Sequence, residues 1–216
     1  MEQEITQRLP IIGDLAPDFE AITTHGKIKL SDYRSKKWVV LFSHPADFTP
    51  VCTTEFIAFS SSHDEFVKLN VQLLGLSIDS VHSHLAWVNN VKEKMGVKIP
   101  FPVIADLDMQ IAKKYGMIHP SSSSTATIRA VFFIDDKGVL RAMVYYPLTN
   151  GRFIPEIIRL VKALQTTDKY GVSTPANWQP GEKVVIPAPA TAEALEKRLK
   201  EGYECKEWYL CFKHLE

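Results

Sequence analysis

The chain has 216 residues, 45% of them hydrophobic and 23% charged, and its 25 basic residues balance its 25 acidic ones. This composition is ordinary for a soluble globular protein and leaves room for one domain with a sizeable core plus an appendage. The formal net charge of zero argues against nucleic acid or an anionic membrane as the main partner, because both favour a basic surface.

The amino-terminal segment and the cysteine content both favour the cytosol. The first ten residues, MEQEITQRLP, include two glutamates and no apolar run, so we expect no signal peptide. No stretch approaches the roughly 18 apolar residues of a transmembrane helix. The three cysteines do not form the dense, even set of a small secreted domain. We therefore expect a cytoplasmic protein whose thiols are reactive, metal-binding or buried.

Strands and helices alternate along most of the chain. Apolar runs bounded by turn residues predict strands, two of them within residues 19–30 and the others at 37–43, 71–78, 102–105, 130–134 and 139–145. Apolar residues at helical spacing predict helices at about 50–69, at a segment with Leu85, Val88 and Met95 on one face, at a short segment ending at Gly116, and at about 154–164. Asp136-Lys137-Gly138 is a hairpin signal between the last two strands.

This order predicts an α/β fold with a mixed central β-sheet and helices on both faces. After about residue 168, four prolines between residues 175 and 189 exclude a regular helix and indicate an extended arm. Thr191 can cap a short helix that Gly202 closes, and we expect the aromatic tail beyond it to pack on another subunit. We therefore divide the chain into a domain of residues 1–168 and a C-terminal dimerisation arm of residues 169–216.

Cys52 stands in the first turn of the helix that follows the buried strand at 37–43. The free N–H groups and the positive dipole at a helix start favour a thiolate, and open α/β sheets bind ligands at the carboxyl ends of their strands. A lone cysteine is more often an inert small hydrophobe. Here, however, Pro45, Thr49 and Cys52 form a P-x-x-x-T-x-x-C pattern with more constraint than a core residue needs, which indicates a reactive thiol.

The segment HPADFTPVCTTEF, residues 44–56, resembles the peroxidatic motif of the peroxiredoxins, which are thiol peroxidases with a thioredoxin-like fold. The resemblance extends over nearly the whole chain. Residues 170–216 look like the C-terminal arm of the one-cysteine, peroxiredoxin 6-like subfamily, in the archaeal and bacterial type that keeps tail cysteines. It implies a thioredoxin-like fold and a peroxidase that reduces hydrogen peroxide and organic hydroperoxides without a cofactor or metal.

The resemblance also implies roles for single residues. Cys52 would attack the peroxide and become a sulfenic acid, the first step of cysteine oxidation. Pro45 would shield the thiolate, while Thr49 and Arg129 would hold the peroxide and stabilise the leaving oxygen. Without that context, an arginine at the start of a strand is more often a surface ion-pair partner.

Three supporting residues follow from the same resemblance. His44 looks like the histidine found at this place in the subfamily, where it would contact the peroxide. A loop histidine can equally be a hydrogen-bonded structural residue, so both interpretations stay open. Glu55 and Arg152 look like the pair that orients the catalytic arginine.

The tail cysteines, Cys205 and Cys211, admit three interpretations. They can pack in the aromatic tail, bind a metal together with His214, or resolve the sulfenic acid through a disulfide. The metal interpretation ranks low, because C-x5-C-x2-H lacks a close cysteine pair and a fourth ligand. The resemblance favours resolution through a Cys52–Cys211 link between chains, with a Cys205–Cys211 disulfide as an alternate or intermediate.

Other motifs give no further site. His82 and His84 form an H-x-H pair whose members point apart on a helix, which favours a solvated face over a metal site. The chain has no G-x-S-x-G, G-x-G-x-x-G, P-loop or C-x-x-C motif, so we expect neither phospholipase activity nor a nucleotide cofactor.

The expected partners come from the resemblance as well. They are a peroxide, a thioredoxin- or glutaredoxin-like reductant, and further copies of the chain in a dimer or a ring of five dimers. The rival hypothesis is not enzymatic: the same motif could serve a redox relay or sensor, and a ring-shaped oligomer could act as a holdase chaperone.

Overall fold

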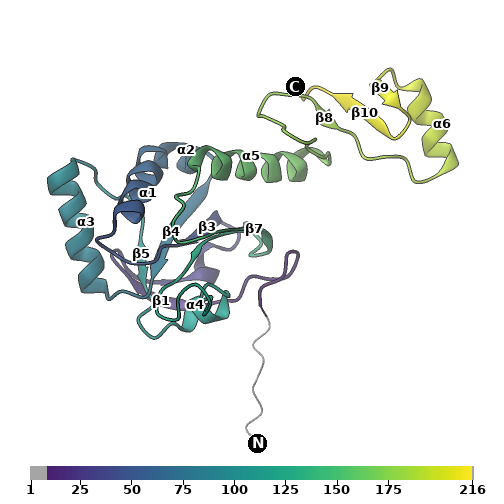
Figure 1. Ribbon diagram of the computed structural model, residues 1–216. Coiled ribbons are helices and arrows are strands. Elements are labelled where there is room, and N and C mark those ends of the chain that lie inside the picture. The colour runs from purple at the N-terminus through teal and green to yellow at the C-terminus, as the bar shows by residue number, and fades with distance from the viewer. Residues whose placement is uncertain (1–8, 216) are drawn as a thin grey trace, which may run out of the picture. The chain divides into compact units, whose positions relative to one another are not determined.

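The computed structural model describes residues 9–215 (Figure 1). The chain forms two compact units, one ending at Ile154 and the other beginning at Pro155. The domain limits expected from the sequence, 1–168 and 169–216, stay a prediction.

The first unit is built on a seven-stranded sheet with the order β2-β1-β5-β4-β3-β6-β7. The strands are β1 (Glu20–Thr23), β2 (Gly26–Lys29), β3 (Trp38–Ser43), β4 (Val71–Ser77), β5 (Val103–Ala105), β6 (Arg129–Ile134) and β7 (Leu140–Tyr146). The central strands β3, β4 and β5 pair in parallel and the remaining pairs are antiparallel. The predicted mixed sheet is confirmed, and every predicted strand is present.

Helices cover both faces of this sheet, as predicted. The helices of the unit are η1 (Leu30–Tyr33), α1 (Pro50–Ser61), α2 (His63–Lys68), α3 (Val81–Met95) and α4 (Gln110–Lys114). Alternate residues of β3 point to opposite faces. Leu41 packs in one core cluster with Ile111 of α4, whereas Phe42 stacks on Phe59 of α1, with ring centroids 4.2 Å apart.

The single helix predicted for residues 50–69 is interrupted. Ser62 separates α1 from α2 and has ψ near 3°, outside the helical range. Its N–H still donates to the carbonyl of Ala58, and its own carbonyl accepts from Glu65, so the chain turns without losing backbone hydrogen bonds. The apolar spacing persists across the break, with Phe59 and Phe66 both fully buried.

The predicted buried face of α3 is wrong. Leu85 and Met95 are 45% and 48% exposed, and the buried residues of the helix are His84, Trp87 and Val91. These three also follow helical spacing, at i, i+3 and i+7. The apolar pattern missed His84 because it counted histidine as a surface residue.

The second unit contains α5 (Ile154–Tyr170) from its second residue onward, α6 (Ala192–Lys200) and a small sheet of order β8-β10-β9. Its strands are β8 (Val184–Val185), β9 (Glu204–Glu207) and β10 (Leu210–Lys213). The Thr191 hydroxyl accepts from the N–H of Ala194 at 3.1 Å, which confirms the predicted cap of α6. A small core forms around Trp178 and Val184.

The tail hairpin β9–β10 was not predicted. The aromatic tail residues Trp208 and Tyr209 lie at its turn and are 44% and 53% exposed. Among the described residues, no helix combines the length and apolar character needed to cross a bilayer.

Candidate active site

Cys52 lies in the first turn of α1, where the sequence predicts it. The helix begins at Pro50, a residue suited to this position because its missing N–H would have no helical partner. The Cys52 side chain is fully buried and its thiol is free. Cys52 therefore lies among orphan backbone donors at the positive end of a helix, close to the carboxyl end of β3.

The loop before α1 carries the other motif residues. Thr49 is the N-cap residue, but its hydroxyl donates to the carbonyl of Ala46 at 2.8 Å and does not cap the helix. This bond fixes the hydroxyl and leaves its oxygen lone pairs available to an incoming O–H. Pro45 is half-buried in the same loop.

Arg129 reaches Cys52 from the first residue of β6. Its Nη1 lies 3.4 Å from the Cys52 Sγ and also donates to the Glu55 carboxylate at 2.7 Å. Its Nε and Nη2 both donate to the carbonyl of Leu148, at 2.9 and 2.7 Å. These bonds orient the guanidinium plane toward the sulfur.

Arg152 holds Glu55 from the other side. Its backbone N–H and Nε donate to one carboxylate oxygen, both at 2.8 Å, and Nη2 donates to the other at 2.6 Å. Its Nη1 donates to the carbonyls of Ser43 and Ala130, which belong to β3 and β6. The pair therefore ties α1 to the adjacent strands β3 and β6.

Electrostatics at this cluster follow from its burial. Glu55, Arg129 and Arg152 are 3%, 3% and 6% exposed. Burial alone would raise the pKa of Glu55, but the Arg152 guanidinium and, to a lesser extent, that of Arg129 more than offset it, so this pKa lies below its usual range. Two guanidiniums and one carboxylate give the cluster a formal charge of +1.

His44 lies next to this cluster but bonds elsewhere. Its ring is fully buried, 4.8 Å from the ring of Phe56 and 5.2 Å from that of Trp87. Its Nε2 is 3.0 Å from the Asp47 carboxylate, while Nδ1 is buried with no hydrogen-bond partner among residues 9–215. Burial lowers the pKa of His44, which favours the neutral ring with its proton on Nε2.

Asp47 and His84 are site residues that the sequence did not reveal. His84 is fully buried, with Nδ1 2.8 Å from Asp47 and Nε2 3.0 Å from the carbonyl of Ile104. Both ring nitrogens thus face acceptors. Burial would raise the pKa of Asp47, but hydrogen bonds from His44 and His84 more than offset it and hold the carboxyl ionised.

The expectation of a solvated His82–His84 face is therefore corrected for His84. His82 is exposed, but His84 turns inward to a carboxylate that lies 37 residues earlier in the chain. His44, Asp47 and His84 have ligand atoms within 4.8 Å of one another, so they are the described side chains best placed to hold a metal ion. Their contacts of 2.8–3.0 Å are ordinary hydrogen-bond lengths, and they fit a proton-sharing network.

The tail cysteines form a disulfide between β9 and β10. Cys205 and Cys211 are joined within one chain, opposite each other in the hairpin. Cys205 is exposed, whereas Cys211 is fully buried. With both sulfurs bonded to each other, the two cysteines and His214 cannot form a metal site in this state. The predicted Cys52–Cys211 link between chains stays a prediction.

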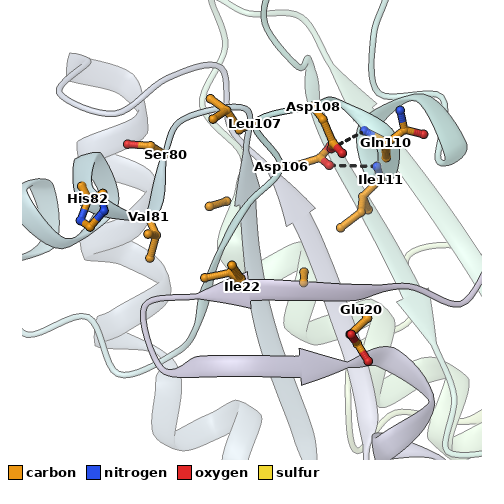
Figure 2. Close-up of a pocket in the computed structure, with 12 residues that line it drawn as sticks. Glu20, Ile22, Ser80, Val81, His82, Asp106, Leu107, Asp108, Gln110 and Ile111 are labelled. Carbon is orange, nitrogen blue, oxygen red and sulfur yellow. Dashed lines mark hydrogen bonds between the residues drawn. The ribbon is translucent and has the colours of Figure 1, made fainter.

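A cavity of about 570 Å³ lies elsewhere in the first unit (Figure 2). Its wall includes Ile22 and Leu107, and none of the candidate catalytic residues contributes to it. Asp106 on the same wall accepts the N–H groups of Ile111 and Ala112 at the start of α4, so its carboxylate is already engaged. The cavity is thus separate from the Cys52 site.

Comparisons with known proteins agree with these features. The AhpC/TSA family model matches residues 12–143, and the model of the C-terminal domain of 1-Cys peroxiredoxin matches residues 163–202. A peroxiredoxin of Aquifex aeolicus is 61% identical over 215 residues, covering 95% of this chain and 97% of that protein. Peroxiredoxin 2 of Caldanaerobacter subterraneus is 63% identical over 207 residues, covering 95% and 93%.

Solved structures give the same picture. The yeast mitochondrial 1-Cys peroxiredoxin superposes with a TM-score of 0.86 at 42% identity, covering 96% of this chain and all of that one. A mutant of peroxiredoxin 6 of Arenicola marina gives a TM-score of 0.84 at 39% identity, covering 94% and 97%. The predicted thioredoxin-like fold with a C-terminal arm is confirmed.

Proposed function

Since the chain belongs to the peroxiredoxin family and is a peroxidase, we propose that Cys52 is the nucleophile that attacks the peroxide. The observation that carries this assignment is the contact of 3.4 Å between its sulfur and the Arg129 guanidinium. With a neutral thiol, the buried cluster of Glu55, Arg129 and Arg152 keeps a formal charge of +1. A negative charge on the Cys52 sulfur brings the formal charge of this cluster to zero. Because uncompensated buried charge is costly, the cluster favours a negatively charged sulfur.

The reaction then follows from the donors around the sulfur. The Cys52 thiolate attacks one peroxide oxygen, the O–O bond breaks, and the second oxygen leaves with the electron pair and takes up a proton. Arg129 and the orphan N–H of Cys52 stabilise the charge that develops on the leaving oxygen. Thr49, whose hydrogen is engaged with Ala46, accepts the peroxide O–H and so orients the substrate. Cys52 becomes a sulfenic acid.

Resolution uses the tail cysteines of another copy of the chain. Cys211 attacks the sulfenic acid, a Cys52–Cys211 disulfide forms, and water leaves. Cys205 then attacks Cys211, which frees Cys52 and forms the Cys205–Cys211 disulfide. Support for the last step comes from the hairpin, which brings these two sulfurs to bonding distance.

The remaining partners are proposed from the family. A thioredoxin- or glutaredoxin-like protein reduces the final disulfide, and the chain assembles into a dimer and a ring of five dimers. In the yeast mitochondrial 1-Cys peroxiredoxin, thiol resolution proceeds via glutathione/thioredoxin systems. The exposed aromatic residues Trp208 and Tyr209 favour a tail that packs on a second copy.

Turnover of hydrogen peroxide with a dithiol reductant tests the assignment of Cys52. Cys52→Ser should abolish turnover, while Thr54→Ala, an exposed change on the same helix, should retain it. Full activity in Cys52→Ser would disprove the proposal. Consumption of only one peroxide per wild-type chain would instead favour the redox relay.

A further inference from the structure

The two sulfurs of the tail disulfide differ in accessibility. All four residues of β9 are exposed, including Cys205, whereas the Cys211 side chain on β10 has no exposed surface. Thiol–disulfide exchange requires an incoming thiolate to reach one sulfur directly. Cys205 is therefore the sulfur that a reductant attacks, and Cys211 is the leaving group.

A cavity of about 290 Å³ opens beside Cys205. Its wall comes from the end of α6, the following turn and β9, and comprises Arg198, Leu199, Gly202, Tyr203, Cys205, Lys206, Glu207 and Trp208. Sites for small molecules range from roughly 300 to 1,000 Å³. The volume at the lower end of that range fits a small thiol.

Arg198 gives this cavity a preference for anions. Its side chain is only 9% exposed, and its Nη2 donates to the carbonyl of Pro187 at 2.9 Å. Its Nε and Nη1 are buried with no hydrogen-bond partner in the described part of the chain. The Glu201 carboxylate is 3.9 Å from Nε, which is an ion-pair distance but too long for a hydrogen bond, and the guanidinium carbon lies 5.5 Å from the centroid of the Tyr203 ring, so neither contact uses the N–H donors.

Such an arginine is a strong candidate to bind a carboxylate. A desolvated cation with unused donors is costly, and the guanidinium fork matches the two oxygens of a carboxylate. Lys206, next to Cys205 on β9, adds a second positive charge, against one negative charge from Glu207. The charged side chains on the wall thus sum to +1.

We propose that this cavity binds a small thiol that carries a carboxylate, with the carboxylate on Arg198 and the sulfur directed at Cys205. The guanidinium turns outward about its terminal bonds to present Nε and Nη1 to the ligand. This site gives the protein a direct route of reduction besides the dithiol protein. The inference deepens the proposed function and rests on it for the origin of the disulfide.

The exchange balances in two steps. The bound thiolate attacks the Cys205 sulfur, the Cys205–Cys211 bond breaks, and Cys211 leaves as a thiolate that takes up a proton. A second small thiol, as its thiolate, attacks the sulfur of the first small thiol in the mixed disulfide. Cys205 leaves as a thiolate that takes up a proton, and the protein now carries two free tail thiols. Two small thiols are oxidised to their disulfide while one protein disulfide is reduced.

The test uses full-length Cys52→Ser protein whose tail disulfide has been formed with diamide. The rate of reduction, followed by thiol alkylation and mass spectrometry, is measured with reduced glutathione, which carries carboxylates, and with neutral 2-mercaptoethanol. Adding Arg198→Gln should lower the rate of reduction by glutathione about tenfold, which corresponds to about 1.4 kcal/mol. The rate of reduction by 2-mercaptoethanol should change less than about twofold. Because the rate with each thiol is compared between the variant and the parent protein, differences in intrinsic reactivity between the two thiols do not affect the result.

A matched control is available one residue away. Lys197 on α6 is 78% exposed in its side chain, so Lys197→Gln removes the same charge outside the cavity and should leave both rates unchanged. Arg198→Lys, which keeps the charge but loses the fork, should give an intermediate glutathione rate.

Three results would overturn the proposal. Arg198→Gln could slow reduction by both thiols equally, which would mean a structural role, it could slow neither, or glutathione could fail to reduce the tail disulfide of the parent protein. Because the assay lacks Cys52 and peroxide, its failure leaves the proposed peroxidase chemistry intact. Failure of the Cys52 test, in turn, leaves this docking site intact.

Discussion

The Nη1 atom of Arg129 lies 3.4 Å from the sulfur of Cys52, although the two residues are 77 positions apart in the chain. Two contacts set this distance. The carbonyl of Leu148 accepts two of the guanidinium's hydrogen bonds, and the carboxylate of Glu55 accepts another. The guanidinium is thus already oriented toward the sulfur before peroxide arrives, which is the preorganisation that charge stabilisation requires.

Arg129→Lys should therefore impair the reaction even though it keeps the positive charge. A lysine keeps one positive charge, but it cannot donate to the Leu148 carbonyl, Glu55 and the leaving oxygen together. Removing a preorganised donor typically costs about 10²–10³ in rate, so we expect the second-order rate constant with hydrogen peroxide to fall by about that factor.

The control for this prediction is Arg141→Lys. Arg141 lies on the neighbouring strand β7, where its Nη1 is 3.2 Å from the Asp135 carboxylate and its side chain is 23% exposed. This variant should keep the wild-type rate constant. If Arg129→Lys also kept it, the contact between Arg129 and Cys52 would have no catalytic role.

Glu55 should make the stability of the protein depend on acidity. Its pKa in the folded state lies below the ordinary value of 4.5. Below about pH 4.5 the unfolded chain therefore binds a proton that the folded chain does not, and stability is lost as the pH falls toward the folded pKa. Above that window the contribution is fully present.

Urea unfolding of wild type and Glu55→Gln at a series of pH values measures this contribution. Glu55→Gln should be less stable at pH 7, because both buried arginines lose their counter-ion. Below pH 4.5 its free energy of unfolding should fall less steeply, by up to about 1.4 kcal/mol per pH unit. Glu93→Gln, an exposed change on α3, should parallel wild type. Parallel curves for Glu55→Gln would show that the pKa of Glu55 is not lowered.

His84 and His82 offer a second matched pair, two residues apart on α3. His84 is buried and bonds both Asp47 and the carbonyl of Ile104, whereas His82 is exposed. A glutamine can replace only part of the two bonds that His84 makes. We expect His84→Gln to lower the free energy of unfolding by about 1.5–3 kcal/mol, and His82→Gln to change it by less than about 0.5 kcal/mol. Similar values for both would mean that the buried network contributes little.

In contrast to these histidines, several elements of the fold can be predicted from their local sequence alone. The central strand β3 is a continuous apolar run with six buried residues, so its local pattern predicts it without knowledge of the rest of the chain. The helix start that holds Cys52 is likewise local, because Pro50 marks it. The fold class follows from the order of such elements.

Prediction from sequence failed for residues whose surroundings are formed by other segments of the chain. His84 is buried because Asp47, 37 residues earlier, compensates its polar ring, and no spacing within α3 records that partner. The strand β9 reads ECKE, with all four residues exposed, so it lacks the alternation that identifies a half-buried strand. Its pairing with β10 is visible only in three dimensions.

The proposed resolution step predicts which tail cysteine links two chains. Cys211→Ser should abolish the covalent dimer that wild type forms after one equivalent of peroxide, as seen on a non-reducing gel, because Cys211 is proposed to attack the Cys52 sulfenic acid. Cys205→Ser is the informative partner variant. It keeps Cys211 but lacks the thiol that would form the Cys205–Cys211 disulfide, so the covalent dimer should accumulate beyond the wild-type level. If Cys211→Ser still gave covalent dimers and Cys205→Ser did not, the two roles would be exchanged, and the exposed cysteine would be the one that resolves.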